Sequence, residues 1–144
     1  MKIPALTTLL LVFQSQAHGA DLDRCPLLPR GAQLQWHFSH DQHLHFDVCY
    51  ATPPFSDVQV FGFYFSEEPA SFLDNPERIG VGTVAGHEVT WFGRGSNFNV
   101  GPFSRWAKIA PYEGSSDFIL VYLYADSEAE LQSRLETLRK TKLR

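Results

Sequence analysis

Apolar and polar residues alternate along two neighbouring stretches in the first third of the chain. In residues 33–38 (QLQWHF) every second residue is apolar, and residues 43–50 (HLHFDVCY) repeat the pattern. A period of two is typical of a β-strand with one apolar face and one polar face. Residues 39–42 (SHDQ) supply a tight turn between them. We therefore predict an amphipathic β-hairpin in which Phe38 and Leu44 share the apolar face.

Two later stretches are apolar on both alternating sets of positions. Residues 58–65 (VQVFGFYF) and 118–125 (FILVYLYA) show this pattern. It predicts strands in the middle of a sheet that is covered on both sides. Weaker patterns predict further strands at residues 79–84, 87–92 and 105–110. The glycines within residues 80–86 favour a bend or a hairpin at that point.

The end of the chain carries a helix signal. Ser127 followed by Glu130 forms a capping box, in which the hydroxyl accepts from the Glu130 amide and the carboxylate reaches back. An apolar stripe follows at helical spacing, formed by Leu131, Leu135 and Leu138. We therefore predict a helix over residues 127–140 that lies against one face of the sheet.

These elements together indicate the α+β class. We predict a mainly antiparallel sheet of about six or seven strands with one C-terminal helix packed on it. A β-sandwich with an appended helix is the alternative arrangement.

The first nineteen residues have the three regions of a secretory leader. Lys2 supplies a positive start, residues 5–13 are an apolar run of nine, and a short polar stretch ends in small residues. Cleavage after Gly19 places Ala17 and Gly19 where the peptidase needs small side chains. The apolar run is about half the roughly twenty residues that span a bilayer, so we expect no stable membrane span. Residues 1–19 are predicted to be a signal peptide, and residues 20–144 a single β-rich domain.

The chain has two cysteines, Cys25 and Cys49. An even count in an exported protein predicts a disulfide bond between them. Together with the leader, this bond indicates a periplasmic or secreted protein.

Charge is distributed unevenly along the chain. The net charge is −4 and becomes −5 once Lys2 leaves with the leader. Residues 134–144 carry five basic side chains and one acidic side chain, a net +4, which leaves −9 on the rest of the mature chain. An acidic body disfavours nucleic acid and suits a basic protein partner. The basic helix end is explained most simply by its cations complementing the helix dipole.

Histidines gather in the predicted hairpin. His37, His43, His45 and Asp47 all fall in the polar set of positions. Pairing that joins Phe38 and Leu44 puts His37 beside His43 or His45, and such a group suits zinc or copper. The simpler alternative is a solvated strand face. We therefore predict no cofactor, and we keep zinc or copper as the alternative.

No catalytic motif stands out. A disulfide removes the two thiols as nucleophiles, and no G-x-S-x-G elbow is present. The glycine-rich residues 93–101 have neither a Walker lysine nor G-x-G-x-x-G spacing. We therefore predict that the chain is not an enzyme.

Two loops resemble recognition surfaces in composition. In residues 50–57 (YATPPFSD) two prolines stiffen a loop that presents Phe55, which lowers the entropy lost on docking. Residues 93–106 combine aromatic and arginine side chains with small polar residues, and aromatics and arginines supply most interface energy. The candidates there are Arg94, Phe98, Phe103, Arg105 and Trp106. The alternative is that these aromatics turn inward and complete the core.

The function that these features favour is binding without catalysis. We predict an exported protein that blocks another exported protein, as an inhibitor of an enzyme or as an immunity protein against a toxin. One alternative is a periplasmic metal-binding protein that uses the hairpin histidines. Another is an accessory component of an envelope or secretion assembly, docked through the basic helix end.

Overall fold

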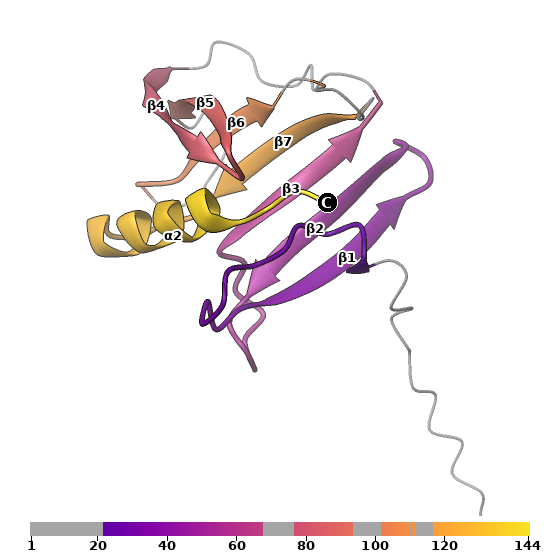
Figure 1. The fold of residues 1–144 in the computed structure, drawn as a ribbon, viewed down its shortest axis with the longest axis horizontal. Coiled ribbons are helices and arrows are strands. Elements are labelled where there is room, and N and C mark those ends of the chain that lie inside the picture. Colours follow the sequence, from indigo (N-terminus) through magenta and orange to yellow (C-terminus); the bar gives the residue numbers. More distant parts are fainter. Residues whose placement is uncertain (1–21, 68–76, 94–101, 110, 112–116) are drawn as a thin grey trace, which may run out of the picture.

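Seven antiparallel strands form one sheet, and a helix follows them at the C-terminus (Figure 1). The computed structural model describes residues 22–67, 77–93, 102–109, 111 and 117–144. The elements are β1 (Gln35–Asp41), β2 (Phe46–Thr52), β3 (Phe61–Ser66), β4 (Arg78–Val84), β5 (His87–Gly93), β6 (Arg105–Ile109), β7 (Phe118–Leu123) and α2 (Glu128–Lys140). The α+β prediction is confirmed. The sandwich alternative is wrong, because the seven strands are hydrogen-bonded into one sheet.

The strand order is β1-β2-β3-β7-β6-β5-β4. Two meanders, β1 to β3 and β4 to β7, therefore meet where β3 pairs with β7. These two strands come from the two stretches that are apolar at consecutive positions. Phe61, Phe63, Val121 and Leu123 are fully buried there. The prediction that both stretches lie in the middle of the sheet is confirmed.

The predicted hairpin is present as β1 and β2, but its register differs from the prediction. β1 continues to Asp41, and the turn is made by residues 42–45. The Asp41 carboxylate accepts hydrogen bonds from the amides of His43 and Leu44, at 2.9 and 2.8 Å. These bonds hold the turn later in the chain than predicted. Phe38 consequently pairs with Cys49 rather than sharing a face with Leu44.

This register sends the apolar sets of the two strands to opposite faces, because side chains alternate along a strand. Trp36 and Phe38 of β1 pack on the face that carries Cys49. Tyr50 of β2 joins the cluster on the other face. Both faces of the sheet are therefore apolar. We call the first the core face and the second the aromatic face.

Helix α2 packs on the core face (Figure 1). Leu131 and Leu138 are buried within the core cluster, as the apolar stripe predicts. The Ser127 hydroxyl accepts from the Glu130 amide at 3.2 Å, which confirms the N-terminal cap. At the other end, the Leu138 carbonyl accepts a hydrogen bond from the Ala85 amide at 3.0 Å. The helix is therefore fixed to the turn between β4 and β5.

The segment before β1 lies on the same side of the sheet and is tied to the C-terminus (Figure 1). Leu27 and Lys142 exchange two backbone hydrogen bonds of 2.7 and 3.0 Å. The predicted disulfide joins Cys25 to Cys49 of β2. Arg144 Nε donates to the Cys25 carbonyl at 3.0 Å. The two ends of the described chain thus hold each other against the sheet.

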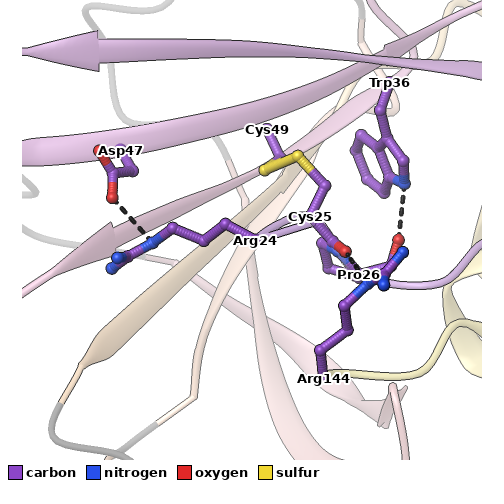
Figure 2. Close-up of a disulfide and its surroundings, with 7 residues drawn as sticks. All are labelled: Arg24, Cys25, Pro26, Trp36, Asp47, Cys49 and Arg144. Atoms are coloured by element: carbon purple, nitrogen blue, oxygen red, sulfur yellow. Dashed lines mark hydrogen bonds and ion pairs between the residues drawn. A yellow bond between two sulfur atoms is a disulfide. The ribbon is translucent and has the colours of Figure 1, made fainter. Parts of the chain in front are cut away.

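Side chains add to this attachment (Figure 2). Trp36 Nε1 donates to the Pro26 carbonyl at 2.7 Å, and Arg24 Nε lies 2.7 Å from an Asp47 carboxylate oxygen. Together with the disulfide, these contacts pin the segment to β1 and β2. We refer to residues 22–28 together with residues 141–144 as the terminal clasp.

Candidate functional site

The connection between β2 and β3 contains the most exposed aromatic side chain in the described parts of the chain. The Pro53 carbonyl accepts a hydrogen bond from the Ser56 amide at 3.2 Å, which closes a four-residue turn. Pro54 occupies the second position of this turn, and Phe55 the third with φ 61°. A proline followed by a residue of positive φ is the pattern of a type II turn. We refer to residues 53–58 as the Phe55 loop.

The base of the Phe55 loop is anchored in the sheet. Thr52 and Val60, which flank it, are 0 % and 3 % exposed. The Val60 amide donates to the Ala51 carbonyl at 2.9 Å, and the Val60 carbonyl accepts from the Tyr124 amide at 3.0 Å. The loop therefore leaves and re-enters the sheet at two fixed points.

Two further hydrogen bonds hold the second half of the connection. The Ser56 hydroxyl accepts from the Val58 amide at 3.1 Å. The Tyr122 phenol, from β7, donates to the Gln59 side-chain oxygen at 2.7 Å. Backbone and side-chain hydrogen bonds therefore both hold this connection in place.

Four of the six side chains of the Phe55 loop are exposed even though its backbone is held by hydrogen bonds. Phe55 is 107 % exposed and Val58 is 65 % exposed. A positive φ is rare for a bulky residue, and such strain is concentrated at functional sites. A strained backbone that exposes a phenyl ring has no packing explanation within the described fold. This arrangement is suited to docking into an apolar pocket of another molecule.

The second predicted recognition loop is only partly within the described residues. Arg94 and Phe98 lie outside them. Phe103 is half-buried and packs against the core cluster, while Trp106 is 7 % exposed and stacks on Phe92 with ring centroids 4.6 Å apart. Phe103 and Trp106 therefore pack inward, as the alternative prediction for this loop has it.

Arg105 begins β6 and is half-buried. Its Nε is buried and has no hydrogen-bond partner among the described residues. Burial lowers the pKa of its guanidinium, and the negative charge of Glu128 acts in the opposite direction.

The aromatic face is a feature that the sequence did not reveal. Trp106, Leu120 and Tyr122 are buried there, surrounded by half-buried rings. These rings belong to Tyr50, Tyr64, Phe92 and Tyr124. Burial raises the pKa of the phenols of Tyr64, Tyr122 and Tyr124.

Gly62 allows this packing, because a Cβ at its position would collide with the Tyr122 ring. Tyr122 itself contacts the rings of Tyr64 and Tyr124. The aromatic face is thus a second packed layer, in which several rings pack against one another.

The hairpin histidines take up different surroundings. His37 Nε2 lies 2.9 Å from the Thr52 hydroxyl, and its ring stacks on Tyr50 with centroids 4.9 Å apart. His43 and His45 lie in the turn rather than beside His37, so the predicted pairing of these histidines is wrong.

Asp47, the fourth predicted ligand, already has two partners. One carboxylate oxygen lies 2.5 Å from His40 Nδ1 and the other lies 2.7 Å from Arg24 Nε. Among the described residues, no group of three or more His, Cys, Asp or Glu is placed to hold a metal ion. The four residues predicted for zinc or copper are therefore not brought together.

The basic end of α2 is largely paired within the chain. The ion pairs are Arg134 with Glu130 (3.7 Å), Arg139 with Glu136 (2.7 Å), Lys140 with Glu136 (3.1 Å) and Arg144 with Asp23 (3.9 Å). Arg139 and Lys140 lower the pKa of Glu136 to about 2. Removing residues 139–144 would thus remove contacts of the fold as well as positive charge.

Comparison with protein-family models, with curated proteins and with solved structures finds no match to this chain. Across the described residues, none of the helices has the length and apolar character needed to span a bilayer. Among the described residues, the Phe55 loop combines the most exposed aromatic side chain with a positive φ, and we take it as the candidate site.

Proposed function

We propose that this chain is an exported, non-catalytic binding protein that blocks another exported protein, an enzyme or a toxin. The Phe55 loop is its docking element. The phenyl ring of Phe55 enters an apolar pocket of the partner, and Val58 lies beside it at the rim of the contact.

The observation that carries this proposal is a fully exposed phenyl ring on a fixed, strained backbone. Binding energy is concentrated in a few large side chains that fill pockets. A loop that is already in its bound shape loses little entropy on docking. Phe55 meets the first condition, and the hydrogen bonds at the base of its loop meet the second.

Export is supported by the leader pattern of residues 1–19 and by the Cys25–Cys49 disulfide. Disulfides persist in oxidising compartments such as the periplasm and the cell exterior. The partner would be found in the same compartment. The exposed Asp57 beside Phe55 favours a pocket with a basic rim, in keeping with the acidic body of the chain.

Capture from an envelope extract tests the proposal. The full chain is expressed, and the purified product is used as bait at micromolar concentration, beside Phe55→Ala and Leu44→Ala variants. Leu44 is a matched control, since it is also an exposed apolar side chain in a turn. We expect a specific protein to be captured by the wild type and by Leu44→Ala. Phe55→Ala should bind it at least about tenfold more weakly, because truncating a central anchor costs 2 kcal/mol or more.

The captured protein is then identified and assayed for its own activity, for example hydrolysis of peptidoglycan. Wild type and Leu44→Ala should inhibit it, and Phe55→Ala should not. Recovery of no specific protein would contradict the proposal. Equal inhibition by all three baits would also contradict it.

A further inference from the structure

Among the described residues, no strand pairs with the outer edge of β4. β4 is the last strand in the order and lies at the outer end of the sheet, where β5 is its neighbour (Figure 1). Exposed edge strands offer unpaired backbone groups to other chains, and proteins commonly protect them with charges, prolines or short length. β4 is seven residues long and its sole charge is Arg78 at its start.

Apolar side chains are exposed along this edge. Val81 is 64 % exposed and Ile79 is 46 % exposed. The start of the strand contains a β-bulge between Arg78 and Gly80. Residues 80–84 pair regularly with β5. The middle of β4 is therefore a regular strand with an exposed β-branched side chain at its centre.

The sequence of β4 is nearly symmetric about Val81. Residues 79–83 read Ile-Gly-Val-Gly-Thr, so β-branched residues alternate with glycines in both directions. An antiparallel pair of such strands, related by a two-fold axis at Val81, opposes valine to valine and glycine to glycine. Pairs of β-branched side chains stabilise neighbouring strands. An added Cβ at Gly80 would meet nothing within 4 Å, so the described residues leave this face of the strand uncovered.

Charge also suits a second copy. In the two-fold arrangement the Arg78 side chains lie at opposite ends of the paired strands and do not repel each other. Each lies at the end where the other copy carries Thr83, whose β5 neighbour is Glu88. A negative charge therefore lies two strand spacings, about 10 Å, from each Arg78 backbone, so the charges at both ends of the interface are of opposite sign.

We propose that β4 pairs with β4 of a second copy of this chain, antiparallel and centred on Val81, to form a two-fold dimer with one continuous sheet. Such an interface is self-complementary, as closed symmetric dimers require. This inference is independent of the Phe55 loop and stands whether or not the proposed inhibition is correct.

Cysteine cross-linking tests the register. The native cysteines are paired, so Val81→Cys introduces one free thiol. On the two-fold axis, residue 81 of one copy lies opposite residue 81 of the other. Their Cβ atoms are about 5 Å apart, near the separation in a disulfide. Residue 83 is displaced from its counterpart by four residues, about 13 Å. Under mild oxidation we expect Val81→Cys to form covalent dimers at least about tenfold faster than Thr83→Cys or Leu44→Cys.

Sedimentation of the unmodified protein gives a second measurement. We expect the wild type to show a dimer whose fraction rises with concentration, as should Leu44→Lys. Val81→Lys should sediment as a monomer with the same far-ultraviolet circular dichroism. Equal cross-linking rates for the three cysteine variants would overturn the proposal. A wild type that is monomeric at every concentration tested, or a dimer that Val81→Lys leaves intact, would overturn it as well.

Discussion

The terminal clasp and the Phe55 loop are both irregular segments attached to β2, and they differ in what they do with their side chains. The clasp joins β2 through Cys49, and the loop leaves it after Thr52. Both contain proline, and both are held by backbone hydrogen bonds. In the clasp, Cys25 is fully buried, whereas in the loop Phe55 is fully exposed.

This difference separates two reasons for fixing an irregular backbone. In the clasp, the fixed backbone keeps apolar side chains buried against the core face of the sheet. In the Phe55 loop, fixed backbone leaves an apolar ring in water and adopts a strained φ. Stability alone explains the first segment and not the second. Substitutions in the clasp should therefore affect folding, and substitutions at Phe55 should affect binding.

The largest effect is expected from removing the disulfide. Replacing both Cys25 and Cys49 by alanine releases a loop with a sequence separation of 24. On the chain-entropy model this lowers the free energy of unfolding by about 3–4 kcal/mol. Urea unfolding followed by circular dichroism measures the change. A loss below about 1 kcal/mol would show that the remaining contacts of the clasp hold it without the covalent bond.

A smaller effect is expected where the Phe55 loop is tied to the aromatic face. Tyr122→Phe removes the hydrogen bond to Gln59 and keeps the ring, so it should lower the free energy of unfolding by about 0.5–1.5 kcal/mol. Amide hydrogen exchange at residues 59 and 60 should become faster. Tyr50→Phe is the matched control, a ring of the same cluster that stacks on His37. Similar exchange at residues 59 and 60 in both variants would mean that Tyr122 does not hold the loop.

How far the sequence predicts the fold depends on the distance over which each interaction acts. The central strands and α2 follow from local patterns, because burial on both faces and the Ser127 cap are encoded within a few residues. The hairpin register is an exception. It depends on hydrogen bonds that the Asp41 carboxylate accepts from His43 and Leu44, which are local, but the alternation of apolar and polar residues does not show them. The strand order depends on the pairing of β3 with β7, which are distant in sequence.

The same distinction applies to the candidate site. Phe55 was predicted to be exposed because the two prolines before it are a local signal. Trp106 has similar chemistry but is buried. Its cross-strand neighbours, Phe92 and Tyr122, come from strands that the sequence alone does not place beside it. The predicted pairing of His37 with His43 or His45 is wrong because it rests on the predicted hairpin register.

Phe55→Gly separates folding from binding most directly. Glycine adopts a φ of 61° without strain, whereas a bulky residue pays about 1–2 kcal/mol in the left-handed region, partly offset by the entropy that glycine loses on folding. Unfolding in urea and affinity for the captured partner are measured on the same preparation. We expect a free energy of unfolding that is unchanged or higher by up to about 1 kcal/mol, with affinity at least about tenfold weaker. Lower stability with unchanged affinity would mean that Phe55 is a packing residue and that the partner binds elsewhere.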